Sequence, residues 1–165
     1  MDLTKIPFEQ AFRHGSRKGA KVKWIVIHAM AGSYEGSRAW FKNPKVQASA
    51  HYLISQDGKK VLNMVKIEES AWSVIGANSK SVSIEHEDRQ KCMTDPNWFT
   101  PEMFKTSTEL AAALCRKFGL KHDAILGHND PIFRALGNDH ACPGPYANLQ
   151  KYRDEVARLL ACQTT

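Results

Sequence analysis

The sequence predicts one α/β domain with a central mixed β-sheet of about five or six strands flanked by helices. Strand-like and helix-like patterns alternate along 165 residues, a length that fits a single domain spanning 1–165. Residues 22–28 are apolar on both faces, which is typical of a strand covered on both sides in the middle of a sheet. Residues 1–20 are polar and basic and predict an irregular lead-in, so we expect the folded core over residues 22–160.

Two further patterns along the chain predict strands. Residues 50–55 and 60–65 flank Asp57-Gly58, and an Asp-Gly pair between two strand-like segments indicates a hairpin with a type I′ turn. Residues 81–87 alternate apolar and polar side chains. This alternation predicts a half-buried strand whose polar face looks into solvent or a cleft.

Three segments carry the start and stop signals of helices. Ser37 is expected to cap a short helix that ends near Pro44. Thr100, followed by proline and glutamate, begins a longer amphipathic helix that ends at Gly119. Apolar residues at helical spacing predict a last helix over about residues 147–161.

The composition is that of a basic, water-soluble protein. Lysine and arginine outnumber aspartate and glutamate by 23 to 17, giving a net charge of +6. This charge suits polyanions such as an acidic cell wall, although a basic solvated surface explains it equally well. No Arg-rich or aromatic binding motif indicates nucleic acid, and no apolar run approaches the roughly 20 residues of a membrane span. We expect synthesis in the cytoplasm, because no secretory signal is visible at the N-terminus. We also expect the protein to be a monomer.

Four cysteines occur without the C-x-x-C spacing of zinc fingers or thioredoxin-like proteins. Cys115 lies in an apolar helical segment and is expected to be a small buried hydrophobic residue. Cys92 and Cys162 are expected to be free thiols in a protein made in the cytosol. Cys142 is different, because a rigid Pro-Gly-Pro segment follows it and would hold a thiolate in a fixed place.

Three residues far apart in sequence are candidate metal ligands. His28 and His128 each end an apolar run, and Cys142 lies in the Pro-Gly loop. Histidine and cysteine suit zinc, and three protein ligands leave a tetrahedral ion one open position, as in catalytic sites. Each histidine alone is more often a hydrogen-bonded residue at a strand end, so the residues themselves leave both interpretations open.

A series of segments, in a fixed order over about residues 22–150, resembles one known family. The segments are Trp24-Ile-Val-Ile-His28, Ser49-Ala50-His51-Tyr52-Leu-Ile, Asp57-Gly58, Ala71-Trp72, Ser81-Val-Ser-Ile-Glu85-His86-Glu87, Thr100-Pro101, Gly127-His128-Asn-Asp130 and Cys142-Pro-Gly-Pro145. Their order and spacing resemble the type 2 N-acetylmuramoyl-L-alanine amidases, a family that includes peptidoglycan recognition proteins and amidase-type phage lysozymes. The resemblance implies their α/β fold and a zinc-dependent cut of the amide between the lactyl group of N-acetylmuramic acid and L-alanine.

The resemblance also implies roles for particular residues. His28 and His128 match the two zinc histidines of the family, and Cys142 matches the third ligand. Glu85 matches the catalytic glutamate of the recycling-type enzymes, whereas a solvated carboxylate on a strand is the alternative. His140 stands two residues before the third ligand, where the family usually has lysine or threonine. We expect His140 to stabilise the developing oxyanion, as an imidazolium or as a neutral N–H donor.

Some positions depart from the family pattern. In the phage lysozymes a tyrosine replaces the catalytic glutamate, and the matching position here is Ala50, so Tyr52 does not inherit that role. The usual Ala-Trp-His-Ala-Gly segment has Ser73 in place of its substrate-contacting histidine. Trp72 and Asn78 are the remaining candidate substrate contacts in this segment.

These features together predict a zinc amidase with peptidoglycan or muropeptides as its substrate, one Zn²⁺ per chain and Glu85 as the base. We expect a phage-type endolysin, a bacteriolytic and antimicrobial enzyme that reaches the cell wall after release from the cytoplasm. A cytosolic muropeptide-recycling amidase is the first alternative, but those enzymes carry aspartate as third ligand. A non-catalytic recognition module is the second, although modules without activity typically lack the cysteine that Cys142 supplies here.

Overall fold

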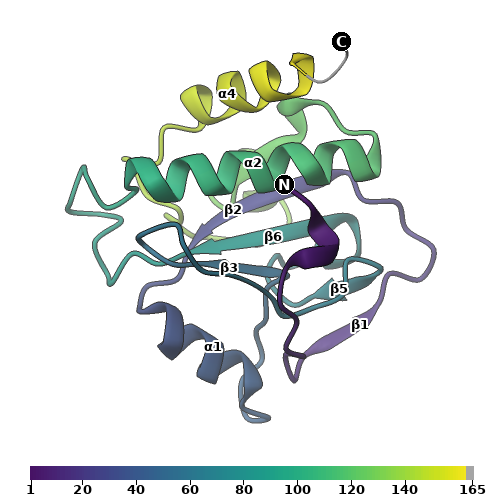
Figure 1. Cartoon of the computed structure of the whole chain (residues 1–165). Coiled ribbons are helices and arrows are strands. Elements are labelled where there is room, and N and C mark those ends of the chain that lie inside the picture. The colour runs from purple at the N-terminus through teal and green to yellow at the C-terminus, as the bar shows by residue number, and fades with distance from the viewer. Residues whose placement is uncertain (163–165) are drawn as a thin grey trace.

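The computed structural model describes residues 1–162 and alternates strands with helices along the chain. Figure 1 shows the elements arranged in layers around one sheet. In chain order the elements are η1 (Leu3–Lys5), β1 (His14–Ser16), β2 (Trp24–Ala29), α1 (Tyr34–Lys42), β3 (Tyr52–Ile54), β4 (Val61–Asn63), β5 (Glu69–Ala71), η2 (Asn78–Lys80), β6 (Ser81–His86), α2 (Pro101–Phe118), η3 (His122–Ala124), β7 (Ile125–Gly127), α3 (Pro131–Arg134) and α4 (Leu149–Ala161).

The central sheet has five strands in the order β4-β3-β6-β2-β7. Strands β3, β6, β2 and β7 are parallel, and β4 alone runs antiparallel to its neighbour β3. Helices α2 and α4 cover one face of this sheet, and α1 lies on the other with the two-stranded sheet β1-β5 (Figure 1). The predicted α/β fold with a mixed sheet is therefore confirmed, and β2 and β6 occupy its centre.

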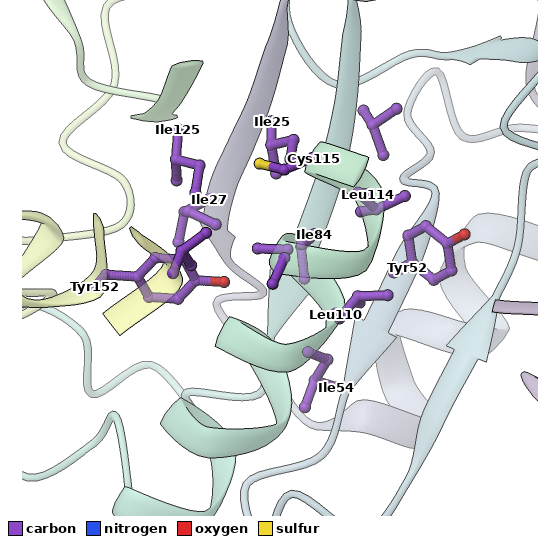
Figure 2. Packing of buried hydrophobic residues seen from close by; sticks show 14 of the residues in the cluster. Ile25, Ile27, Tyr52, Ile54, Ile84, Leu110, Leu114, Cys115, Ile125 and Tyr152 are labelled. Atoms are coloured by element: carbon purple, nitrogen blue, oxygen red, sulfur yellow. The ribbon is translucent and has the colours of Figure 1, made fainter. Parts of the chain in front are cut away.

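The main hydrophobic core fills the space between the sheet and the helices α2 and α4. Ile25 and Ile27 of β2 belong to one buried cluster with Leu110 and Leu114 of α2 and Tyr152 of α4 (Figure 2). Each of these side chains is fully buried, and burying one Leu, Ile or aromatic side chain stabilises a fold by roughly 1.5–3 kcal/mol. Because side chains alternate along a strand, the other residues of β2 point to the opposite face, where the candidate site lies.

The polar face of β6 is more deeply covered than its alternation predicts. Ser81 and Ser83 are fully buried, so the expectation of a half-buried strand is wrong at these two positions. Arg17 donates a 2.9 Å hydrogen bond to the Ser81 carbonyl, and the His51 ring contacts the Ser83 hydroxyl at 3.2 Å. Residues from other segments therefore cover this face of β6. Within the strand, Glu85 alone stays partly exposed.

The segment 1–20 is more ordered than the irregular lead-in that the sequence predicts, although most of its residues lie outside helices and strands. It contains the short helix η1 and the strand β1, which pairs antiparallel with β5. Arg17 follows β1 directly and is 7% exposed, with its guanidinium donating to the carbonyls of Ile67 and Ser79. A three-residue strand of His, Gly and Ser has no apolar alternation, so the pattern that marks longer strands is missing from the sequence.

The hairpin β3-β4 is confirmed, but its turn is not of type I′. Only Gly58 has a positive φ, of 67°, whereas a type I′ turn needs positive φ at both central residues. The Gly58 N–H donates to the Ser55 carbonyl at 2.9 Å, and the Asp57 carboxylate accepts from the Ser55 hydroxyl at 2.6 Å. A Cβ at Gly58 would lie 2.5 Å from the Glu102 carbonyl oxygen, so the turn packs directly against the start of α2.

The helices begin and end close to their predicted positions, with one correction. Helix α1 is capped by Ser33, whose hydroxyl accepts from a backbone N–H, and Ser37 lies inside the helix, buried. Thr100 caps α2 as predicted, and Gly119 ends that helix with φ 66°. Asn148 caps α4, which agrees with the predicted last helix. Ser33 and Ser37 are one helical turn apart, so the sequence pattern alone does not distinguish which of them is the cap.

Candidate metal centre and active site

The three predicted metal ligands converge at one edge of the sheet. His28 lies near the end of β2, His128 follows β7, and Cys142 lies in the loop before α4. One ligand atom from each of them lies within 4.8 Å of the others, close enough for all three to share an ion. The parallel pairing of β2 with β7 explains this, because it places the carboxyl ends of both strands at the same edge.

The loop that carries Cys142 is held against both strands. The Ala29 N–H donates to the Cys142 sulfur at 3.1 Å. On the other side, a Cβ at Gly127 would lie 3.0 Å from Cδ of Pro143 and 2.6 Å from the Asn129 side-chain oxygen. Because Gly127 has no side chain, the loop can approach the backbone directly before His128. This close approach brings the sulfur of Cys142 to the two histidines.

The chemistry of the three residues fits zinc. Nε2 of His28 is buried and has no hydrogen-bond partner among residues 1–162. A buried polar atom without a partner is costly, and a metal ion would satisfy it. Two imidazoles and one thiolate form a typical three-residue zinc set, with the fourth position left for water or substrate.

The protonation of these ligands depends on their burial. Burial holds the pKa of His28 well below its ordinary value, and the neighbouring His128 lowers it further. Burial likewise lowers the pKa of His128. Both rings are therefore neutral near pH 7, which is the form that binds a metal. Burial raises the pKa of the Cys142 thiol, with Glu85 as a second cause, and a bound cation would reverse this by favouring the thiolate.

Glu85 lies directly beside the cluster. It pairs with His28 across the parallel strands β6 and β2, and its Oε1 is 3.9 Å from Nδ1 of His28. Its side chain is 13% exposed, and Oε2 has no hydrogen-bond partner among the described residues. Burial, and then the nearby Asp88, raise the pKa of Glu85 to about 8. This carboxyl can therefore hold a proton near neutral pH, whereas a metal cation nearby would favour its charged form.

His140 lies on the outer side of the same cluster. Its ring stacks on the ring of His128 with centroids 4.4 Å apart and an interplanar angle of 25°. The ring centroids of His28 and His128 are 4.5 Å apart, so His128 contacts both of the other imidazoles. His140 is exposed, unlike the two candidate ligands. The structure thus brings His140 next to the centre, where a substrate could reach it.

The two predicted substrate contacts lie at the ends of one segment, residues 72–78, which we call the wall loop. Trp72 is 40% exposed, and the Arg13 guanidinium lies 5.4 Å from its ring centre. Asn78 is partly buried, and its side-chain oxygen accepts the backbone N–H groups of Ser73 at 3.0 Å and Val74 at 2.7 Å. Asn78 therefore holds the wall loop in shape, and only its NH₂ group is left to meet a substrate.

Sequence reasoning did not single out two buried residues near the centre. Asn138 accepts a hydrogen bond from Nε2 of His128 at 3.1 Å. The Asp88 carboxylate accepts from the Gly32 N–H at 3.1 Å and from the Cys92 N–H at 3.3 Å. Both residues lie in loops outside the matching segments, and their importance depends on contacts distant in sequence.

Comparisons with known proteins identify a matching family and similar proteins. Residues 18–145 match the family model described as N-acetylmuramoyl-L-alanine amidase. The chain is 34% identical over 96 residues to N-acetylmuramoyl-L-alanine amidase A of Achromobacter lyticus, an alignment that covers 58% of this chain and 52% of that protein. It is 27% identical to N-acetylmuramoyl-L-alanine amidase CwlL of Bacillus licheniformis, over 89% of this chain and 44% of that protein.

A solved structure shares the fold across nearly the whole chain. The hydrolase AmiA of Staphylococcus aureus superposes with a TM-score of 0.76 at 18% sequence identity, covering 98% of this chain and 87% of that one. The chain spans about half the length of the curated relatives that it matches. The family model covers most of the chain, and the chain belongs to the N-acetylmuramoyl-L-alanine amidase family.

Proposed function

We propose that this protein is a zinc-dependent amidase that hydrolyses the amide between the lactyl group of N-acetylmuramic acid and L-alanine in peptidoglycan. The observation that carries the proposal is the convergence of His28, His128 and Cys142 within 4.8 Å, with Glu85 beside them. Membership of the N-acetylmuramoyl-L-alanine amidase family supports the choice of bond. Three ligands and an adjacent carboxylate suit hydrolysis better than a structural zinc site, which is normally closed by four ligands.

The proposed reaction assigns a step to each residue around the centre. When bound, zinc supplies Lewis-acid chemistry, polarising a carbonyl and making water more acidic. Glu85 accepts a proton from the attacking water and passes it to the alanine nitrogen as the carbon–nitrogen bond breaks. The products are a lactyl carboxylate and a free alanine amino group. His140 donates an N–H hydrogen bond to the carbonyl oxygen while negative charge develops there.

Trp72 and Asn78 are proposed to contact the substrate from the wall loop. Trp72 offers an exposed aromatic face, which suits sugar rings or methyl groups of the substrate. Asn78 offers its NH₂ group, because its oxygen is held by the backbone of Ser73 and Val74. Ser73 replaces the histidine that the family usually has, so substrate contacts at this position differ from those of typical members.

We further propose that the protein acts on the cell wall as a phage-type endolysin. The net charge of +6 favours binding to an anionic cell wall. Cys142 as the third ligand distinguishes the chain from recycling amidases, which carry aspartate at that position. Within residues 1–162, no helix has the length and apolarity that crossing a membrane requires. We propose a monomer with one zinc ion, made in the cytoplasm and acting after release.

Digestion of purified sacculi tests the proposed bond. New alanine N-termini and new reducing sugars would be measured in parallel, with a Glu85→Gln protein as the control for contaminating enzymes. We expect alanine N-termini from the wild type alone. New reducing sugars without alanine N-termini would instead identify a glycosidase and refute the proposal.

A choice of substrates separates the endolysin from the recycling enzyme. The same protein would be given intact sacculi and soluble anhydromuropeptides at equal amide concentration. An endolysin releases alanine N-termini from intact sacculi, whereas a recycling enzyme prefers the soluble fragments. Turnover confined to the soluble fragments would overturn the endolysin assignment and leave the amidase assignment intact.

A further inference from the structure

We infer that Asn138 is a positioning residue that fixes the tautomer of His128 and ties this metal ligand to the wall loop. The inference rests on the proposed function, because it concerns the zinc ligand His128. Asn138 follows α3 and is 1% exposed, so its side-chain amide is removed from water. A buried amide must find its partners within the protein, and those of Asn138 are two backbone segments and one ligand ring.

Backbone groups set the orientation of this amide. The Asn138 oxygen accepts the Ile75 N–H at 2.9 Å, and the Asn138 NH₂ group donates to the carbonyls of Ile75 and Phe133, each at 2.9 Å. The polarity of backbone N–H and C=O groups is fixed. A reversed amide would place its NH₂ against an N–H and its oxygen against two carbonyls. The oxygen therefore has to point towards Ile75 N–H and, with it, towards His128.

The orientation of the amide determines the tautomer of His128. Nε2 of His128 lies 3.1 Å from the same Asn138 oxygen. An amide oxygen only accepts hydrogen bonds, so Nε2 must carry the hydrogen. A metal-binding imidazole is neutral and has a single N–H. The lone pair is consequently on Nδ1, which is the nitrogen that His128 offers to the metal, and Asn138 supplies the outer hydrogen bond that zinc histidines normally make.

The same amide also joins the wall loop to the metal centre. Ile75 lies in the middle of the wall loop and exchanges two hydrogen bonds with Asn138. The oxygen that accepts Ile75 N–H also accepts from His128, so the position of the loop and the orientation of the ligand ring share one acceptor. Asn78 provides the natural comparison, because its oxygen accepts two N–H groups of this loop and its bonds go to Ser73 and Val74 rather than to His128.

Zinc affinity measured without substrate tests the inference. Metal-free protein would be titrated with Zn²⁺ in competition with a chromophoric chelator. Asn138→Ala removes the acceptor for His128 and should weaken zinc binding about 10–100-fold, the usual cost of losing such an outer bond. Asn138→Asp keeps an acceptor oxygen but loses both donations to carbonyls, so it should lower thermal stability while zinc affinity stays near the wild-type value.

Asn78→Ala is the matched control, because it also removes two hydrogen bonds to wall-loop N–H groups. It should lower thermal stability and leave zinc affinity near the wild-type value. The absorption spectrum of the Co²⁺-loaded protein gives a second readout, and we expect it to change in Asn138→Ala and to persist in Asn138→Asp and Asn78→Ala.

Three results would overturn the inference. The first is a folded Asn138→Ala protein with wild-type zinc affinity. The second is equal loss of zinc affinity in Asn138→Asp and Asn138→Ala, and the third is equal loss in Asn78→Ala, since either would mean that loop order controls the metal. If Asn138→Ala does not fold, a loss of zinc affinity in Asn138→Asp, which keeps the acceptor oxygen, or in Asn78→Ala would overturn the inference. A wild-type protein that binds no zinc would instead refute the proposed function.

Discussion

Glu85 combines burial with a place next to the candidate metal ligands. Its carboxyl lies 3.9 Å from the neutral ring of His28, and the nearby Asp88 disfavours a second negative charge. These surroundings raise its pKa to about 8. A metal cation beside Glu85 would favour the charged carboxylate, which is the form that can accept a proton from water and pass it to a leaving amine.

We therefore expect Glu85→Gln to remove proton transfer and leave the metal site in place. The turnover number should fall on the order of 10²–10⁴, the usual contribution of a general acid–base group. Zinc content would be measured on the same preparation, and it should equal that of the wild type. Turnover at the wild-type level in a zinc-loaded Glu85→Gln protein would refute the role of Glu85.

His140 should contribute to the rate through the developing oxyanion. It stacks on His128 and is exposed, so its removal leaves the three ligands in place. His140→Ala should lower the turnover number on the order of 10²–10³, as when one oxyanion donor is lost. The Michaelis constant and zinc affinity should change little. Loss of zinc rather than of turnover would show that His140 supports the ligand His128 instead.

At the scale of elements, the close approach of the Cys142 loop to β7 depends on Gly127. A Cβ there would lie 2.6 Å from the Asn129 oxygen, 2.9 Å from Leu149 and 3.0 Å from Pro143. Gly127→Ala should therefore lower the free energy of unfolding by about 1–3 kcal/mol, the range for forcing extra volume into a packed region. It should also weaken zinc binding, because the loop that carries the sulfur must move.

Gly15→Ala is the control for this change, since a Cβ at Gly15 would lie 3.5 Å from the nearest atom, which is ordinary contact. Urea unfolding of both proteins would measure the difference. Equal stability of the Gly127→Ala and Gly15→Ala proteins would contradict the packing argument.

A buried histidine in the segment before β3, whose ring contacts Ser83 of β6, makes the stability of the fold depend on pH. His51 is fully buried, and burial, reinforced by the Arg17 cation, lowers its pKa to about 3. The unfolded chain has a histidine pKa of about 6.5. The unfolded state thus binds a proton that the folded state does not, so His51 destabilises the fold as pH falls from about 6.5 towards 3.

Between pH 6.5 and pH 5 this one residue should cost about 2 kcal/mol, at about 1.4 kcal/mol per pH unit. Urea unfolding of the metal-free protein at the two pH values measures the loss, and His51→Gln should reduce it by about that amount. His86, with a pKa lowered to about 4 by burial, contributes in the same direction in both proteins. An unchanged pH dependence in His51→Gln would contradict the assignment.

The sequence predicts the long elements well because their apolar periodicity reflects burial directly. The helices α2 and α4 are predicted in this way, the central strand β2 by its continuous apolar run, and the hairpin by its Asp-Gly turn. The sequence does not predict β1, because its three residues have no apolar alternation. It also does not predict the burial of Ser81 and Ser83, because Arg17 and His51 cover them from distant segments. The same reason explains why Asn138 was not predicted, since its partners lie 10 and 63 residues away.

In the molecule as a whole, the central sheet carries the main hydrophobic core on the face covered by α2 and α4, and the candidate metal ligands lie at the edge where β2 and β7 end. A chain of hydrogen bonds joins β2, the strand that carries His28, to the helices α2 and α4. His86 bonds the His28 carbonyl at 2.7 Å and the Ser107 hydroxyl at 2.6 Å, and Ser107 bonds the Tyr152 hydroxyl at 2.6 Å. All partners are buried, so this polar path fixes β2 against α2 and α4.

Removal and return of zinc tests whether the three candidate ligands hold the ion that the proposed reaction requires. The protein would be stripped of metal with a chelator, dialysed, and assayed on sacculi for new alanine N-termini while Zn²⁺ is added back stepwise. We predict no turnover without metal and full turnover at one zinc per chain, with Cys142→Ala requiring far more zinc. Full turnover by the metal-free protein would contradict the account.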